Sequence, residues 1–325
     1  MSRKKIAILR GGNSNEYDVS LKTGVSILQN LSEDKYIPLD IFLDKKNVWH
    51  VRGVPVSPER ALCGVDAVWI ALHGASGEDG SIQRMLERFS VPYVGAGAFA
   101  SMVCFNKELS KNIFEKNGAL VPRHTVLKVS DSLEREVQNV FRTFPQPCIV
   151  KPVCSGSSVG VSLARSYEEL LRGVKEAFQH SPQVLIEEHI RGKEATVGIV
   201  DGLRGEALYS LPPVEIIPHH ESSFFDFNAK YGGKSEERCP GNFTTEETQE
   251  LKRLAQVAHT ALHLKHFSRS DFIVSRSGIY FIEANSATAC GLTAESLLPK
   301  SLLAVGIGLP EFVDHVVHQA LERRR

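Results

Sequence analysis

The sequence has 325 residues, with 38 basic and 38 acidic side chains that cancel to a formal net charge of zero. This length is enough for two or three domains, and the balanced charge gives no overall basic surface for nucleic acid or an anionic membrane. No apolar stretch approaches the ~18 residues of a membrane span, and the apolar run near the start is too short for a signal peptide. The six cysteines form no C-x-x-C pair, so we expect reduced thiols in a cytoplasmic protein.

The first hundred residues alternate between strand and helix patterns. Strands are predicted at 4–9, 36–44, 65–74 and 91–97, and helices within 10–31 and 79–89. The strand at 65–74 is apolar almost throughout, as expected for a strand that is covered on both faces. This alternation predicts a mostly parallel α/β domain over residues 1–100.

Residues 101–190 are predicted to form a separate α+β unit. The predicted elements are a helix at 106–118 that ends at Gly118, strands at 147–153 and 184–190, and a helix at 165–178. Ser166 and Glu169 have the spacing of a capping box at the start of that last helix. The most Gly/Ser-dense turn of the chain, CSGSSVG, directly follows the strand that carries Lys151.

Residues 191–325 begin with strands. A hairpin is predicted at 194–211 with a turn at Asp201-Gly202, and Thr244 and Glu247 form a capping box for a later helix. Between them lies a polar stretch, 218–243, with few periodic apolar residues. A connection of this length in a compact chain is functional or disordered.

The apolar strand GIYFIEAN ends with Glu283 and Asn285, which lie on the same strand face. We predict a hairpin whose turn is Arg276-Ser277-Gly278, so that Ser275 faces Ile279 and Asp271 lies directly opposite Glu283. Arg269 falls on the same face. Two facing carboxylates repel each other, and such hard oxygen ligands suit Mg²⁺ together with phosphate oxygens. An exposed hairpin in which Arg269 neutralises one acid explains the same residues.

The CSGSSVG turn is a candidate phosphate-binding loop. Gly156 and Gly160 allow backbone N–H groups to approach a phosphate closely, and Ser157 and Ser158 add hydroxyl donors. Lys151 supplies a cation just before the loop. The G-K-[ST] of a Walker A sequence is absent, and an ordinary hairpin turn is the alternative.

Other charged residues fit a nucleotide site less specifically. Lys107 is a second candidate cation for phosphates, although a lysine in the first turn of a solvated helix is the simpler interpretation. Glu187, Glu188 and Glu194 flank a link that could offer backbone groups to an adenine edge and a carboxylate to ribose. Surface glutamates beside basic neighbours are the alternative.

Two further features favour structural interpretations. His259, His263 and His266 have helical spacing but no H-E-x-x-H motif, so we expect a half-exposed helix face rather than a zinc site. Cys290 lies close to the acidic hairpin in sequence. We expect a packed thiol there rather than a nucleophile.

Six motifs follow one another along the chain: GGNSNEYDVSL (11–21), ALHGASGEDGSIQ (71–83), VKPVCSGSSVGVS (150–162), EEHIRGKE (187–194), FDFNAKY (225–231) and RSD…IEAN (269–285). In this order they resemble the motifs of D-alanine–D-alanine ligases of the ATP-grasp superfamily, and the resemblance runs nearly end to end. It implies a three-domain ATP-grasp fold with an N-terminal parallel-sheet domain, 1–100. The nucleotide would bind between a central domain, 101–190, and a C-terminal domain, 191–325.

The resemblance also implies a reaction. ATP would phosphorylate the carboxylate of one D-alanine, and the amine of a second would attack the acylphosphate to give D-alanyl-D-alanine for peptidoglycan precursors. Two Mg²⁺ ions are implied, with Mn²⁺ as an alternative, and the resemblance allows a homodimer. A ligase with another second amino or hydroxy acid is an alternative, as is an inactive nucleotide-binding paralogue.

Carried over by position, the resemblance implies roles for individual residues. The residues implied in catalysis are Glu16, Ser157, Tyr231, Arg269 and Gly291. The residues implied in substrate binding are Glu16, His73, Lys230 and Ser296. The residues implied in ATP binding are Lys107, Lys151, Ser157, Ser158, Glu187, Glu188, His189, Ile190 and Glu194. The residues implied in metal binding are Asp271, Glu283 and Asn285.

Two segments carry more specific implications. The stretch 218–243 would be a mobile lid over the acylphosphate, and its Tyr231 favours D-alanine as the second substrate. After Asn285 the sequence runs NSATACG, longer than in the family and without its proline, so Gly291 is only the best match for the oxyanion-hole glycine. Ser155 stands where the family often has an acid.

Overall fold

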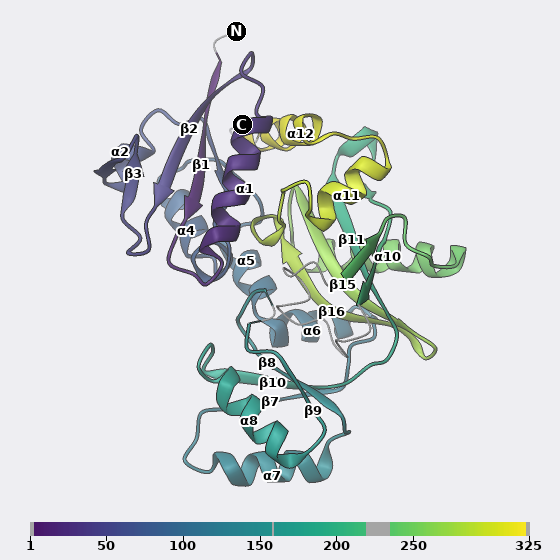
Figure 1. The fold of residues 1–325 in the computed structure, drawn as a ribbon. Coiled ribbons are helices and arrows are strands. Elements are labelled where there is room, and N and C mark those ends of the chain that lie inside the picture. Colours follow the sequence, from purple (N-terminus) through teal and green to yellow (C-terminus); the bar gives the residue numbers. More distant parts are fainter. Residues whose placement is uncertain (1–2, 158, 219–234, 323–325) are drawn as a thin grey trace.

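The computed structural model describes residues 3–157, 159–218 and 235–322. Within these residues the chain forms three β-sheets with helices packed against them (Figure 1). The first sheet contains parallel strands and the other two are antiparallel, which confirms the predicted combination of α/β and α+β structure. In the described part of the chain, no helix combines the length and apolar character needed to cross a membrane.

The first sheet has the strand order β4-β3-β2-β1-β5-β6 and is parallel from β2 to β6. Its strands are β1 (Lys4–Gly11), β2 (Tyr36–Leu43), β3 (Trp49–Val51), β4 (Val54–Val56), β5 (Ala67–Ile70) and β6 (Tyr93–Val94). The helices of this part are α1 (Tyr17–Asn30), α2 (Pro58–Ala61), α3 (Ala75–Glu78) and α4 (Ser81–Arg88). Trp69 and Val68 of β5 point into different hydrophobic cores, so this strand is covered on both faces as predicted. The β3–β4 hairpin is an addition to the prediction.

The second sheet is antiparallel with the order β7-β10-β8-β9. Its strands are β7 (His124–Lys128), β8 (Cys148–Pro152), β9 (Ser162–Ala164) and β10 (Gln183–Glu188). Helices α7 (Leu133–Thr143) and α8 (Tyr167–Ala177) bury a separate core against it. Only one of the two hydrogen bonds of the capping box predicted for α8 is present. Ser166 Oγ accepts a hydrogen bond from Glu169 N, but the Glu169 carboxylate accepts from Arg165 N instead of Ser166 N.

The third sheet has the order β14-β13-β11-β15-β16, and β12 pairs with β11. Its strands are β11 (Lys193–Asp201), β12 (Leu208–Ser210), β13 (Val214–Pro218), β14 (Ser235–Arg238), β15 (Phe267–Ser275) and β16 (Gly278–Ser286). The other elements are α10 (Thr245–Ala261), α11 (Leu297–Ala304), α12 (Leu309–Glu322) and the 3₁₀ helices η1 (Leu203–Gly205) and η2 (Ala287–Ala289). Both halves of the capping box between Thr244 and Glu247 are present, as predicted.

Helices α5 (Ala98–Phe105) and α6 (Lys107–Lys116) lead from the first sheet to the second but pack against the third. Phe114 of α6 stacks on Phe281 of β16, with 3.8 Å between the ring centroids. The last helix, α12, returns to the first sheet (Figure 1), and its Phe312 packs edge-on against Phe267 of β15. The division into domains at residues 100 and 190 stays a prediction. Because α5 and α6 pack against the third sheet, we would assign these two helices to the domain that contains it.

The β15–β16 hairpin differs from the prediction near its turn. Ser275 pairs with Gly278, so the turn contains only Arg276 and Ser277, and the first pairs are one residue out of the predicted register. A bulge between Asp271 and Phe272 then shifts the register by one residue. Beyond the bulge Asp271 pairs with Glu283, as predicted.

The histidines on and after α10 do not form the expected half-exposed face. His259 and His266 are buried, and only His263 is exposed. His259 lies between Asp201 Oδ1 at 2.9 Å and Ser268 Oγ at 2.7 Å, so its ring is held by structural hydrogen bonds.

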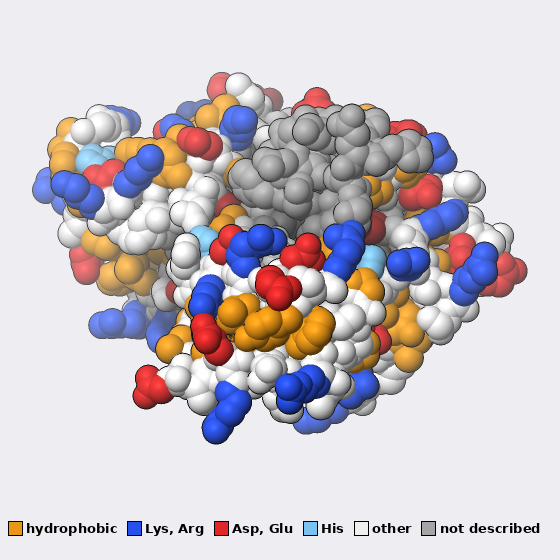
Figure 2. Space-filling view, turned by 60° about the horizontal axis from the view of Figure 1, so that its bottom comes forward, with side chains coloured by type: hydrophobic (Ala, Val, Ile, Leu, Met, Phe, Trp, Pro, Cys, Tyr) orange, Lys and Arg blue, Asp and Glu red, His pale blue; other side chains and the backbone are white. Residues whose placement is uncertain are grey.

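All six cysteines are free thiols, as expected. On the face seen in Figure 2, basic and acidic side chains are interspersed.

Candidate active site

Two cavities of about 620 Å³ and about 640 Å³ adjoin each other where the sheets meet. The first lies between the second and third sheets and is lined from β8, β10, β15 and β16. The second lies between the first and third sheets and is lined from α1, α3, β16 and α11. Both are lined by Lys107, Arg269 and Glu283 and by the loop segment 155–157. Groups at this boundary can therefore contact ligands in both cavities.

The predicted site residues line one or both of these cavities. Those that line the first are Lys107, Lys151, Ser157, Glu187, Glu188, His189, Ile190, Glu194, Arg269, Asp271 and Glu283. Those that line the second are Glu16, His73, Lys107, Ser157, Arg269, Glu283, Asn285, Gly291 and Ser296. Ser158, Lys230 and Tyr231 lie outside the described residues, as does most of the predicted lid.

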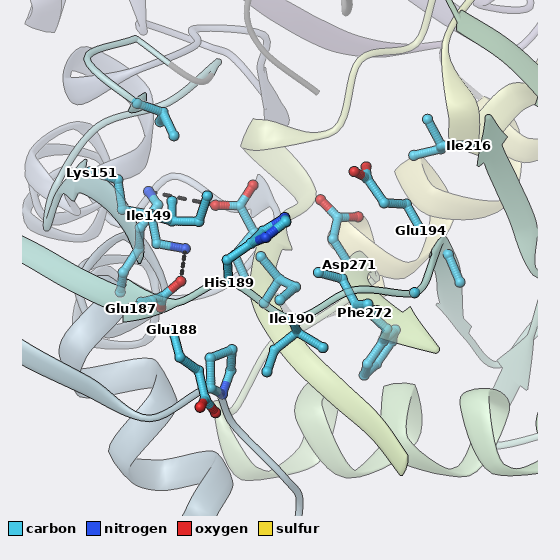
Figure 3. A pocket seen from close by; sticks show the side chains of 18 of the residues that line it. Ile149, Lys151, Glu187, Glu188, His189, Ile190, Glu194, Ile216, Asp271 and Phe272 are labelled. Carbon is cyan, nitrogen blue, oxygen red and sulfur yellow. Dashed lines mark ion pairs between the residues drawn. The ribbon is translucent and has the colours of Figure 1, made fainter. Parts of the chain in front are cut away.

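Glu187 lies between two lysines at one wall of the first cavity. Its carboxylate is 2.6 Å from Lys151 Nζ (Figure 3) and 2.7 Å from Lys111 Nζ. All three side chains are buried. Burial acts to raise the pKa of Glu187, but the two ammonium groups lower it overall and keep the carboxylate ionised. The alternative of a surface glutamate is therefore wrong for Glu187. Lys111 was not singled out in the sequence, although it follows Lys107 by four residues on the same face of α6.

The segment from Glu188 to Ile190 crosses the first cavity (Figure 3). The Glu188 carboxylate accepts a hydrogen bond from Arg123 N at 2.9 Å, so its charge is directed to the backbone just before β7. Glu188 N and His189 N already donate to backbone carbonyls. A backbone contact from this segment to a ligand would therefore come from Ile190 or from carbonyl oxygens.

Arg269 forms a forked ion pair with Asp271 at the boundary of the cavities. Its Nε and Nη2 each lie 3.0 Å from one oxygen of the carboxylate. Thr196 Oγ1 and Asn285 Nδ2 donate to the same carboxylate, at 2.5 Å and 3.1 Å. Burial acts to lower the pKa of Arg269, but Asp271 raises it overall, so the guanidinium stays charged. The alternative of an exposed hairpin is wrong, although Arg269 does neutralise Asp271.

Glu283, opposite Asp271, faces a different cation. Lys107 Nζ is 3.6 Å from Glu283 Oε2 and donates to Ser155 O at 2.5 Å. Lys107 is largely buried, so the interpretation of a lysine on a solvated helix surface is wrong. Asp271 and Glu194 also line the first cavity (Figure 3). The boundary of the two cavities thus carries two carboxylates, Asp271 and Glu283, each beside a cation.

The Gly/Ser-rich loop reaches across to the start of α1. Ser157 Oγ donates a hydrogen bond to the Glu16 carboxylate. A Cβ added to Gly156 would lie 2.3 Å from Glu16 Oε2, so only glycine allows this approach. The close contact of Gly156 is therefore with a carboxylate, in addition to any phosphate that the loop could bind.

The second cavity contains two buried groups with shifted protonation. His73 Nε2 is hydrogen-bonded to Thr23 Oγ1 at 3.1 Å, and burial together with Arg269 lowers its pKa to about 4. Glu78 accepts a hydrogen bond from Gly74 N at 2.7 Å, while burial and the charge of Glu16 raise its pKa to about 8. The two shifts favour the uncharged form of both side chains. Glu78 was not singled out, although it lies in the quoted motif ALHGASGEDGSIQ.

Gly291 and Ser296 meet at the far wall of the second cavity. A Cβ on Gly291 would lie 2.7 Å from Ser296 Oγ, which is also hydrogen-bonded to Thr293. The η2 helix takes up part of the chain between Asn285 and Gly291, and Gly291 still lines the cavity. Lys300, one helical turn after Ser296, also lines this cavity, and its ammonium is paired with Glu237 at 2.8 Å.

Comparisons with known proteins identify the family to which this chain is similar. The family model for the D-ala D-ala ligase N-terminus matches residues 5–61 and 53–96 of this chain. The family model for the D-ala D-ala ligase C-terminus matches residues 113–318. The chain is 36% identical over 327 residues to the D-alanine–D-alanine ligase of Syntrophobacter fumaroxidans, covering 99% of this chain and 100% of the relative. It is 33% identical over 322 residues to that of Clostridium beijerinckii, covering 99% and 100%.

Solved structures show the same fold. The VanG D-Ala:D-Ser ligase from Enterococcus faecalis aligns with a TM-score of 0.85 at 27% identity, covering 98% of this chain and 100% of that structure. The D-alanine–D-alanine ligase from Bacillus anthracis complexed with ATP aligns with a TM-score of 0.78 at 27% identity, covering 99% and 98%. These similarities confirm the fold predicted from the resemblance.

Proposed function

The chain belongs to the D-alanine–D-alanine ligase family, and we propose that it uses ATP to join two D-alanine molecules into D-alanyl-D-alanine for peptidoglycan precursors. The observation that carries this proposal is the shared boundary of the two cavities at Lys107, Arg269 and Glu283. A nucleotide in the first cavity would present its terminal phosphate at this boundary. An amino acid in the second would present its carboxylate to the same point, as direct phosphoryl transfer requires.

The nucleotide would lie in the first cavity. Its phosphates would face Lys107 and Lys151 and the loop segment 155–158, and its adenosine would lie against 187–194. Ile149 and Phe272 supply apolar surface to this cavity, and a planar base needs such surface (Figure 3). Glu194 would bind ribose hydroxyl groups.

The residues present fit magnesium. Glu283 offers a hard carboxylate oxygen at the boundary, and Asn285 uses its amide nitrogen toward Asp271, so its amide oxygen is the atom offered to a cation. The Asp271 oxygens already accept hydrogen bonds from Arg269, Thr196 and Asn285, so Asp271 would exchange some of these bonds for the metal. One or two carboxylates with phosphate oxygens and water are the usual ligands of Mg²⁺ in nucleotide sites. Two Mg²⁺ ions, with Mn²⁺ as an alternative, would neutralise charge on the transferring phosphate when bound.

The first D-alanine would lie in the second cavity with its ammonium near Glu16 and with His73 beside it. A carboxylate oxygen of the substrate attacks the γ-phosphorus, and the bond from that phosphorus to ADP breaks. Arg269, which is charged and paired with Asp271, would stabilise the developing negative charge. The product of this step is an acylphosphate.

The second D-alanine would bind between this acylphosphate and α11, with its carboxylate held by Lys230 and Ser296. Its amine attacks the acyl carbon and loses a proton, and the carbon–oxygen bond to phosphate breaks. Gly291 N–H and Arg269 would stabilise the tetrahedral oxyanion. Tyr231 on the lid 218–243 would join Ser157 and Glu16 to close the site against water.

A phosphate-release assay tests the proposal. With ATP and Mg²⁺, we expect phosphate release that depends on D-alanine and is not supported by L-alanine. If D-serine or another second acid supports faster release than a second D-alanine, the alternative acceptor is correct. ATP binding without turnover on any amino acid would instead favour the inactive paralogue. A homodimer and a cytoplasmic location stay predictions.

A further inference from the structure

Three charged side chains lie in a row from the protein interior to the first cavity. Lys111 Nζ is 2.7 Å from Glu187 Oε1, and Lys151 Nζ is 2.6 Å from Glu187 Oε2. Lys151 and Glu187 line the cavity, whereas the Lys111 side chain is 0% exposed and lies behind them. The row carries two positive charges and one negative charge, so its net charge is +1 when all three groups are ionised.

Lys111 has no direct access to a ligand. It lies on α6 against β16, where its ammonium donates to Phe281 O at 3.3 Å and lies 5.9 Å from the centre of the Phe281 ring. Burying an ammonium ion is costly unless a partner compensates it, and Glu187 is the carboxylate that does so. Burial lowers the pKa of Lys111 to about 8, so the side chain is mostly protonated at pH 7.

We propose that Lys111 is a positioning residue for the nucleotide phosphates, because it neutralises Glu187 and leaves the charge of Lys151 available to the ligand. Without Lys111, both oxygens of Glu187 would turn to Lys151. Lys151 and Glu187 would then form a neutral pair, and the cavity would lose one positive charge next to the expected phosphates. This inference rests on the proposed nucleotide site.

The inference predicts that the effect of Lys111 depends on the charge of the ligand. In Lys111→Met we expect the Kd of ADP, measured by calorimetry on the whole protein, to rise roughly tenfold, as for a lost interaction with a charged group. The Kd of adenosine, which has no phosphate, is expected to change less than about twofold. Lys116→Met is the matched control, because Lys116 lies on the same helix and is exposed.

Replacing Glu187 as well separates this electrostatic role from a merely structural one. In Lys111→Met/Glu187→Gln, no carboxylate neutralises Lys151, so the ratio of ADP affinity to adenosine affinity should return to within about threefold of the wild-type ratio. The double variant also removes the unpaired buried acid, so it tests the inference even if Lys111→Met does not fold.

Three results would overturn the inference. One is an equal loss of ADP and adenosine affinity in Lys111→Met, and another is a double variant whose affinity ratio stays lowered. The third is an unchanged ADP affinity in both variants. If the wild-type protein binds neither ADP nor adenosine, the proposed function itself fails, and this outcome is distinct from the other three.

Discussion

Asp271 lies directly opposite Glu283 across the β15–β16 hairpin, and each carboxylate has a cation of its own. Arg269 forms a forked pair with Asp271, while Lys107 lies 3.6 Å from Glu283. Facing acids would repel each other without these partners. The pairing of charges makes the four side chains a single electrostatic unit at the boundary of the two cavities.

Glu283→Gln tests the predicted metal site. The variant keeps the size of the side chain and removes its charge, so we expect the Mg²⁺ concentration for half-maximal phosphate release to rise at least about tenfold. Turnover at saturating ATP should fall by about 100-fold. Glu295→Gln is the control, because the Glu295 side chain lines the second cavity but is 92% exposed. An unchanged Mg²⁺ dependence in Glu283→Gln would contradict the assignment.

Arg269→Lys tests the fork at Asp271. Lysine keeps the positive charge beside Asp271 but cannot donate two parallel hydrogen bonds, so the cation would no longer be fixed toward the reacting groups. We expect kcat to fall by about 10²–10³, with a change in Tm of no more than a few degrees. Steady-state kinetics and thermal unfolding on the same preparation measure both quantities. Turnover within about threefold of wild type would show that Arg269 serves only to neutralise Asp271.

Glu78 gives the protein a pH-dependent stability. Burial and Glu16 raise its pKa from 4.5 to about 8, so between these values the folded state keeps a proton that the unfolded chain has released. The resulting contribution to the free energy of unfolding is fully present below pH 4.5 and is lost as the pH rises toward 8. The amide that replaces the carboxyl in Glu78→Gln does not titrate in this pH range. We therefore expect denaturant titrations at about pH 5 and about pH 8 to differ less for the variant than for wild type. Equal differences would mean that Glu78 is ionised in the folded protein.

The cysteines should differ sharply in reactivity. Burial raises the pKa of Cys290 to about 12 and also raises that of Cys104, so neither forms a thiolate at neutral pH. Cys63 is exposed. Alkylation of the native protein followed by peptide mass spectrometry should therefore label Cys63 first, and Cys290 only after unfolding. Rapid labelling of native Cys290 would contradict the interpretation of a packed thiol.

The elements that sequence predicts well are those with a strong local pattern. The apolar run around Trp69 predicts a strand covered on both faces, and Thr244 with Glu247 predicts a helix start that forms in full. The edge hairpin β3–β4 depends on a two-residue turn at Arg52 and Gly53, both with positive φ. Its strands are only three residues long, too short to show a clear alternation.

The site was harder to predict where it depends on tertiary contacts. The predicted pairing of Asp271 with Glu283 is correct only because a bulge offsets the one-residue error in register near the turn, and that bulge has no clear sequence signal. Lys111 looks like any helical lysine until folding brings Glu187 beside it. Glu78 differs from a surface acid only because it is buried near Glu16, and burial is a property of the assembled fold.

Transfer of an oxygen isotope tests the central claim most directly. D-alanine labelled with ¹⁸O in its carboxylate is incubated with the protein, ATP and Mg²⁺, and phosphate and dipeptide are analysed by mass spectrometry. If an acylphosphate forms and is attacked by the second amine, each D-alanyl-D-alanine is accompanied by one ADP and one phosphate that carries a single ¹⁸O. Dipeptide with unlabelled phosphate, or no dipeptide that depends on D-alanine, would contradict the account.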